Sequence, residues 1–153
     1  MYKNFLVPVD GSNCSKLAYK NAVDLAKLTN AQIVLLQVAY DVDYYSRKGV
    51  LFARKYYNES EIRSESAMIL SGIRKDVDEG DVKITELILF GDPARTIIDE
   101  ARENNFDLIV MGSRGNGPLK GAVLGSVSQQ VLSRGNNMVL TVKDPQEKTK
   151  DHD

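Results

Sequence analysis

The segment with the clearest chemical meaning is rich in glycine: residues 112–128 read GSRGNGPLKGAVLGSVS. It holds five glycines in seventeen residues, follows an apolar run directly, and leads into a helical pattern near Ser126. Glycine permits positive φ values and a close approach of the backbone to a ligand. Successive N–H groups in such a loop form an anion-binding concavity, and a helix start adds donors and partial positive charge. With the hydroxyls of Ser126 and Ser128, the segment suits phosphate binding.

Two well-known phosphate-binding patterns do not fit this segment. A Walker A loop requires Gly-x4-Gly-Lys-Ser/Thr, but Gly117 is followed by proline and Lys120 by glycine. The dinucleotide pattern G-x-G-x-x-G begins at Gly115 and Gly117, yet position 120 is lysine. The spacing that remains is Gly112-x2-Gly115-x9-Gly125-Ser126.

The elements that must position this loop can be predicted from hydrophobic patterns. Five short apolar runs, rich in β-branched residues, are predicted to be buried strands. They cover Phe5–Val9, Gln32–Val38, Ile84–Phe90, Asp107–Met111 and Met138–Val142. Helical periodicity predicts helices from Ser12 to Asn30, from Asn58 or Ser60 to Gly80, from Asp92 and Pro93 through Ala101, and from Ser126 to Arg134 with Gly135 as the stop.

This alternation of strands and helices predicts an α/β fold. Near-continuously apolar strands indicate a mostly parallel sheet with helices on both faces, and right-handed crossovers make it doubly wound. In such sheets a ligand binds beyond the carboxyl ends of the strands, where the strand order reverses. We expect one domain over residues 1–143, followed by a disordered polar tail over 144–153.

Composition limits the classes of partner. The 153 residues are 42% hydrophobic, and 20 Lys plus Arg against 21 Asp plus Glu give a formal net charge of −1. This balance provides no electrostatic footprint for nucleic acid or an anionic membrane, and no apolar run reaches the length of a membrane span. The one cysteine, Cys14, excludes an intrachain disulfide framework, so we expect a cytoplasmic protein.

The glycine spacing resembles that of the nucleotide-binding members of the universal stress protein family, which carry G-x2-G-x9-G-[S/T] at this place. Three other stretches are similar to the family: FLVPVDGS in the first strand, FGDPARTI before the third helix, and DLIVMGSRG at the fourth strand. The resemblance covers roughly Tyr2 to Lys143. It implies a Rossmann-like, five-stranded parallel sheet of the adenine nucleotide alpha hydrolase type, with strand order 3-2-1-4-5.

The resemblance also implies an ATP site, with or without magnesium. Asp10 would accept hydrogen bonds from the ribose, Pro8 and Val9 would border the base, and Val38 would offer backbone groups to adenine. The phosphates would be lined from one side by the end of the fourth strand and its loop, Met111, Gly112, Ser113 and Gly115. The helix start would enclose them with Gly125, Ser126, Val127 and Ser128.

A homodimer through the last strand, Met138–Val142, is a further implication, and pairing of an apolar edge strand is physically sensible. Two departures from the family pattern concern these regions. Gln37 stands where many relatives have histidine, and GNNMVL lacks the proline that often opens the last strand, which bears on where the dimer strand starts.

Several residues also have plainer interpretations. Asp10 can stabilise the turn with Gly11 and Ser12 or cap the first helix. Arg114 and Lys120 can be solvated loop charges or phosphate ligands. Cys14 is expected to be a small buried hydrophobic residue. The single histidine, His152, lies in the expected tail, so no Cys-His or Ser-His pair is proposed.

The leading hypothesis is therefore an ATP-binding regulatory homodimer in a stress response, whose conformation is read by protein partners of unknown identity. AMP or a cyclic nucleotide would satisfy much of the same geometry. A slow ATPase or phosphotransferase, with Asp10 and Ser126 holding magnesium, is the first alternative. The second is a nucleotide-free interaction module that uses the tyrosine-rich segment Tyr40–Asn58, which is otherwise a lid or a surface excursion.

Overall fold

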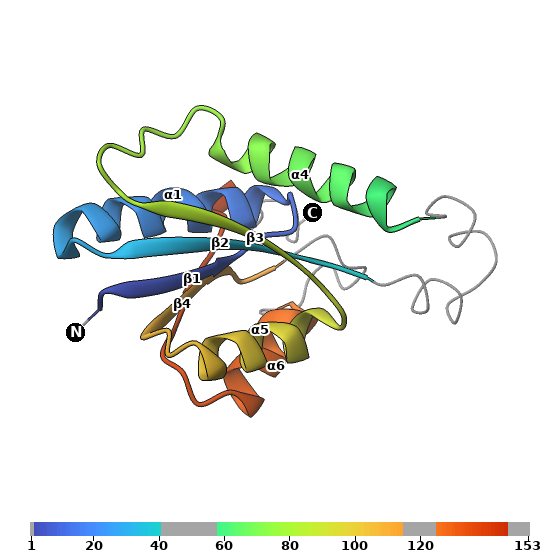
Figure 1. Cartoon of the computed structure of the whole chain (residues 1–153). Helices are drawn as coiled ribbons and strands as arrows, with labels where there is room; N and C mark the ends of the chain where they lie inside the picture. Colours follow the sequence, from blue (N-terminus) through green and yellow to red (C-terminus); the bar gives the residue numbers. More distant parts are fainter. Residues whose placement is uncertain (1, 41–57, 115–124, 147–153) are drawn as a thin grey trace.

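A computed structural model describes residues 2–40, 58–114 and 125–146. It contains a five-stranded, all-parallel sheet in the order β3-β2-β1-β4-β5, which confirms the predicted topology (Figure 1). The strands are β1 (Asn4–Pro8), β2 (Gln32–Ala39), β3 (Ile84–Phe90), β4 (Leu108–Gly112) and β5 (Val139–Val142). The helices are α1 (Asn13–Thr29), α4 (Glu59–Arg74), α5 (Pro93–Glu103) and α6 (Ser126–Arg134). Most of the tyrosine-rich segment, Gly115, Lys120 and the end of the tail lie outside the described residues.

Three of the four helices begin at a residue whose side chain caps the free N–H groups. Ser12 accepts from the Ser15 N–H, Asn58 from Glu61, and Asp92 from Arg95, with Pro93 at the first helical position. At the other end of α1, Asn30 adopts the left-handed conformation with φ 56°. These local signals explain why the predicted starts, and the end of the first helix, agree with the structure.

The end of the second helix was predicted wrongly. α4 ends at Arg74 and does not continue to Gly80. Lys75 leaves helical geometry with ψ 135°, and Asp76 takes a positive φ of 68°. This departure lets Val77 pack against the core, so tertiary contacts end the helix before the glycine is reached. Gly80, with φ 55°, instead lies in the loop that leads to β3.

The sheet separates two layers of helices, as Figure 1 shows for α4 above it and α5 and α6 below it. Side chains alternate along β1: Phe5 and Val7 pack with buried residues of α1 and α4, whereas Leu6 packs with Ala94 and Val131 of α5 and α6. Full burial of such an apolar side chain contributes about 1.5–3 kcal/mol. The two cores therefore fix the strands from both faces and define a single carboxyl edge.

A polar network braces the loop between α4 and β3. The Tyr19 hydroxyl donates to Glu79 Oε1 at 2.6 Å, and Arg74 donates to both Glu79 oxygens at 2.7 Å. Arg74 also reaches Glu86 on β3 at 3.1 Å. The Arg74 hydrogen bonds hold the pKa of Glu79 below its ordinary value, and burial raises the pKa of Tyr19 well above its ordinary value. The network ties the loop to α1 and β3 and keeps the Glu79 carboxylate ionised.

No helix among residues 2–40, 58–114 and 125–146 is both long enough and apolar enough to cross a membrane.

The carboxyl end of β4 packs directly against the start of α1. A Cβ on Gly112 would lie 2.9 Å from the Cys14 carbonyl carbon and 3.0 Å from the Ser15 nitrogen. Backbone atoms cannot turn away as a flexible side chain can, so any side chain here would force β4 and α1 apart. Packing alone therefore requires glycine at position 112, whatever the loop binds.

We expect Gly112→Ala to lower the free energy of unfolding by about 1–3 kcal/mol, because the added methyl overpacks a backbone contact. Gly72→Ala is the matched control. Gly72 lies inside α4 with nothing within 4 Å of an added Cβ, and alanine there stabilises a helix by about 0.5–1 kcal/mol. Urea denaturation of both variants measures the difference. An unchanged stability of Gly112→Ala would contradict the packing role.

Candidate functional site

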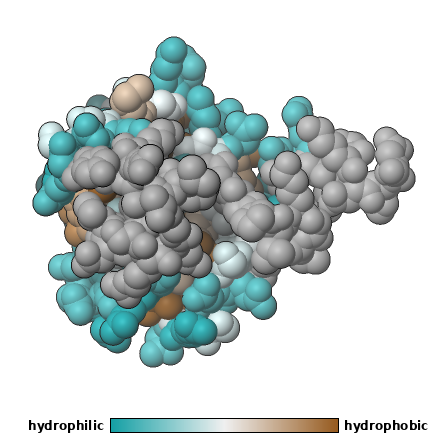
Figure 2. All heavy atoms as spheres, turned by 90° about the vertical axis from the view of Figure 1, so that its right-hand side faces the viewer, coloured by the Kyte–Doolittle hydropathy of each residue, from teal (hydrophilic) through white to brown (hydrophobic). Residues whose placement is uncertain are grey.

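The strand order reverses between β1 and β4. The chain proceeds from β1 through β2 to β3 on one side, and β4 and β5 lie on the other. β1 and β4 pair in parallel, with Phe5 opposite Leu108 and Leu6 opposite Ile109, so their carboxyl ends lie side by side. This is the position where doubly wound sheets bind ligands. Figure 2 faces this edge, and the described residues at its upper and lower margins are largely hydrophilic with small apolar areas between them.

The end of β1 places a carboxylate at this edge. Pro8 and Val9 are buried, and the Val9 N–H donates to the Leu36 carbonyl at 2.8 Å. Asp10 is half-buried, and its Oδ1 accepts from the Ser12 N–H at 2.9 Å. The turn role proposed for Asp10 is thus present, whereas Ser12 supplies the helix cap. A carboxylate offers about four acceptor positions, so this bond is compatible with further donors.

The end of β2 carries a buried polar pair that the sequence analysis did not identify. The Ser66 hydroxyl of α4 donates to Gln37 Oε1 at 2.6 Å, and both residues are buried. The Gln37 amide also donates to the Val38 carbonyl at 3.2 Å. Val38 itself is half-buried and packs on the α5 side of the sheet. A serine four residues after Ile62 on the apolar stripe of α4 was the available signal.

The end of β4 holds the loop by its backbone. The Ser113 N–H donates to the Val142 carbonyl of β5 at 2.8 Å. The Ser113 carbonyl accepts from the Gly125 N–H at 2.5 Å and from the Ser128 hydroxyl at 2.8 Å. Both ends of the segment 114–124 are therefore fixed to one carbonyl group. The Ser128 hydroxyl, which is buried, serves this clamp and also lies 3.1 Å from the Gly125 carbonyl.

Cys14 of α1 also contacts the end of β4 and β5. Its side chain is buried, as expected for a small hydrophobe, and its Sγ donates to the Val142 carbonyl at 3.0 Å. The same sulfur lies 3.7 Å from the Ser113 hydroxyl. Ser113 and Val142 are thus held by α1 as well as by each other.

The start of α6 differs from the other helix starts. Its N-cap is Gly125, and no side chain caps it. The first bond into the helix is from Gln129 N–H to the Gly125 carbonyl at 3.0 Å. Within the part of the chain that the structure describes, the N–H groups of Ser126, Val127 and Ser128 have no acceptor. Three such donors at the positive end of a helix dipole have the chemistry to bind an anion.

The structure thus gathers most of the predicted site at one edge. Asp10 lies two residues after β1, Val38 is the last residue but one of β2, and Met111 and Gly112 end β4. The start of α6 is fixed to Ser113. Gly115 lies outside the described residues, so its predicted part in the loop stays a prediction. In the described ranges no three His, Cys, Asp or Glu side chains are grouped so that they could hold a metal ion.

Comparison with known proteins agrees with this architecture. The model of the Universal stress protein family matches residues 1–143. Universal stress protein MJ0531 of Methanocaldococcus jannaschii is 34% identical over 146 residues, which is 95% of this chain and 84% of that protein. MJ0577 of the same organism is 30% identical over 155 residues, covering 94% of this chain and 96% of that protein.

Solved structures show the same likeness. The structure of MJ0577 has a TM-score of 0.77 at 29% identity and covers 94% of this chain and 97% of its own. A universal stress protein in complex with cAMP has a TM-score of 0.58 at 25% identity and covers 92% of this chain and 96% of its own. The family match over residues 1–143 and the two relatives at 30% identity or more agree with the fold, and the chain belongs to the universal stress protein family.

Proposed function

We propose that this chain binds an adenine nucleotide, ATP, at the carboxyl edge of the sheet between β1 and β4. The observation that carries the proposal is the start of α6. Three N–H groups without a described acceptor lie at the positive end of a helix, and Ser113 fixes that end at the point of strand reversal. The donors are in place before a ligand arrives, so little ordering of the backbone is needed on binding.

The neighbouring strand ends supply the rest of the site in this proposal. The Asp10 carboxylate accepts hydrogen bonds from the ribose hydroxyls, while Pro8 and Val9 border the base. Backbone groups of Val38 meet adenine, and the Gln37–Ser66 pair holds that strand end against α4. Met111, Gly112, Ser113 and Gly115 line the phosphates opposite Gly125, Ser126, Val127 and Ser128. The Ser128 contact comes from its N–H, because its hydroxyl is directed at the Ser113 carbonyl.

Two observations support an adenine nucleotide as the ligand. The G-x2-G-x9-G-[S/T] spacing is present in the sequence, and a solved relative binds cAMP. ATP engages the α6 donors with more negative charge than AMP or cAMP, so we expect the order of affinity to follow the charge of the phosphates.

The proposal includes a magnesium ion bound beside the phosphates. The Ser126 hydroxyl is an oxygen donor at the helix start that is expected to hold the phosphates, and magnesium uses one or two protein ligands beside phosphate oxygens. The ion would neutralise phosphate charge when bound. We propose a regulatory role in a stress response, in which the bound state is read by partner proteins in the cytoplasm. A free, buried Cys14 is consistent with a reducing compartment.

We expect Ser126→Asp to weaken ATP binding at least about tenfold, equivalent to ~1.4 kcal/mol. Ser126 is the exposed first residue of α6, and a carboxylate there competes with phosphate for the free N–H groups. The same carboxylate stabilises a helix start by about 0.3–1 kcal/mol, so loss of binding cannot be attributed to unfolding. Isothermal titration calorimetry with ATP, AMP and cAMP measures the effect, and thermal unfolding confirms the fold.

Ser133→Asp is the control for this change. Ser133 is exposed near the other end of α6, so the added charge is the same but lies away from the free donors. Equal affinity of both variants would show that α6 does not hold the phosphates. If the unmodified protein neither binds ATP in calorimetry nor releases an adenine nucleotide on heating, the proposed function is wrong.

We also propose a homodimer in which β5 pairs with its copy. β5 pairs with β4 on one side, through bonds that include Ile109 N–H to the Met138 carbonyl and Ser113 N–H to the Val142 carbonyl. Backbone groups alternate along a strand, so Val139 and Thr141 direct theirs away from β4. Met138 and Leu140 are 57% and 38% exposed, which makes this edge an apolar surface that a second strand would cover.

Thr141→Pro is expected to convert the dimer to a monomer. Proline removes an outward N–H and leaves the bonds to β4 intact, so the fold is retained. Thr141→Ala keeps the N–H and should remain dimeric. Sedimentation velocity of the three proteins tests the pairing, and a monomeric unmodified chain at high micromolar concentration would contradict it.

A further inference from the structure

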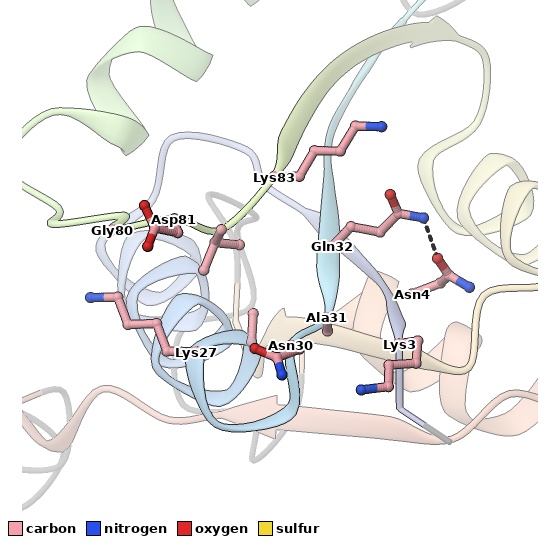
Figure 3. A pocket seen from close by; sticks show the side chains of 11 residues that line it. Lys3, Asn4, Lys27, Asn30, Ala31, Gln32, Gly80, Asp81 and Lys83 are labelled. Carbon is pink, nitrogen blue, oxygen red and sulfur yellow. Dashed lines mark hydrogen bonds between the residues drawn. The ribbon is translucent and has the colours of Figure 1, made fainter.

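A cavity lies at the amino edge of the sheet, at the opposite end of the strands from the proposed nucleotide site. It has a volume of about 740 Å³ and lies between the starts of β1 and β2, the end of α1 and the loop before β3. Figure 3 shows Lys3, Lys27 and Lys83 on three different sides of Asn30 and Ala31. Because β2 has eight residues at ~3.3 Å each, the cavity is roughly 25 Å from the carboxyl edge.

The charge of this cavity contrasts with that of the whole chain. Three lysines and one aspartate, Asp81, line it, although the formal net charge of the protein is −1. In the described part of the chain none of these lysines forms an ion pair, and the recorded ion pairs all use arginine. The cavity therefore carries positive charge that no carboxylate neutralises directly.

Two of the ammonium groups are held in place by carbonyls. Lys3 Nζ donates to the Thr29 carbonyl at 2.5 Å, and Lys27 Nζ donates to the Asp78 carbonyl at 2.7 Å. An ammonium has three donors, so each keeps its charge and two further N–H groups. The Lys27 stem also lies across Gly80, where an added Cβ would be 3.2 Å from Lys27 Cε.

The helix dipole explains only part of this arrangement. Cations at the end of α1 are favourable, which accounts for Lys27 and for the Lys3 contact with Thr29. It does not account for Lys83, which precedes β3 and whose ammonium group has no hydrogen-bond or ion-pair partner among the described residues. Nor does it account for the hollow between the three lysines.

The walls of the cavity are fixed. The Gln32 amide donates to Asn4 Oδ1 at 2.5 Å, which joins the starts of β1 and β2. Glu79, next to Gly80, is held by Tyr19 and Arg74 at 2.6–2.7 Å. The loop that carries Asp81 and Lys83 is thus braced from α1 and α4, and ordering costs on binding are small.

We propose that this cavity is a second ligand site, for a small polyphosphate anion, separate from the carboxyl edge. The volume lies within the roughly 300–1,000 Å³ typical of small-molecule sites. Lysine binds phosphate as a point charge, and three lysines around one hollow favour a multiply charged anion over a singly charged one through their summed positive potential. The site does not depend on nucleotide binding at α6.

The test is an NMR titration of the ¹⁵N-labelled full chain with sodium pyrophosphate at constant ionic strength. We expect saturable shifts of the amides of residues 27–32 and 80–83. Lys83→Met should weaken this binding at least fivefold without changing the fold, since the Lys83 ammonium has no described partner to lose and its backbone bond from Ile33 is kept. Lys20→Met is the matched control, because Lys20 is an exposed lysine of α1 outside the cavity.

Two further titrations distinguish this site from non-specific anion binding and from binding at α6. Citrate tests whether any multivalent anion suffices, and weaker binding than pyrophosphate is expected. Ser126→Asp should leave the amino-edge shifts unchanged even where ATP binding is lost, so failure of either site is recognised separately. Shifts that do not saturate, that are confined to α6, or that weaken equally in Lys20→Met and Lys83→Met would overturn the proposal.

Discussion

Two consecutive peptide groups at the end of β4 connect four elements of this molecule. The Gly112 backbone packs against α1 closely enough to exclude a Cβ. The next residue, Ser113, donates its N–H to β5 and accepts the Gly125 N–H and the Ser128 hydroxyl at its carbonyl. Displacing this strand end would therefore move α1, β5 and α6 together. The glycine-rich loop begins and ends at a point that the surrounding structure holds firmly.

This constraint changes how the glycine spacing is understood. Gly112 is required by its contact with α1, and Gly125 serves as a helix cap that has no side chain to satisfy the first N–H groups. α1, α4 and α5 instead use Ser12, Asn58 and Asp92 for that purpose. A helix start without a side-chain cap is stabilised when an anion takes the place of the cap. One glycine thus sets the packing, and the other leaves the donors available.

Features set by neighbouring residues were predictable from the sequence. The helix starts near Ser12 and Asn58, the cap at Asp92 and the strand order implied by the family resemblance agree with the structure, and the strands lie within one residue of their expected bounds. Features set by distant contacts were not. α4 ends early because Val77 packs into the core and Arg74 bonds Glu79, and neither event leaves a local signal.

The candidate site also combines features that the local sequence predicts with features that depend on distant contacts. The glycine spacing from which we predict a phosphate-binding loop can be read in the sequence, but the Ser128 clamp depends on the position of the Ser113 carbonyl, fifteen residues away. The Gln37–Ser66 pair and the lysine-lined cavity join residues from separate elements, so only the folded structure brings them together. Such contacts give the two ends of the sheet different chemistry, with free helix donors at one end and fixed ammonium groups at the other.

The central claim is that the start of α6 holds the phosphates of an adenine nucleotide. The most direct measurement compares ATP with adenosine in ¹⁵N NMR titrations of the full chain. We expect ATP, and not adenosine, to shift the amide protons of Ser126, Val127 and Ser128 downfield as they form charge-assisted hydrogen bonds, whereas both ligands perturb residues at the ends of β1 and β2. If saturating ATP leaves these three amides unchanged, the phosphates bind elsewhere and the account is wrong.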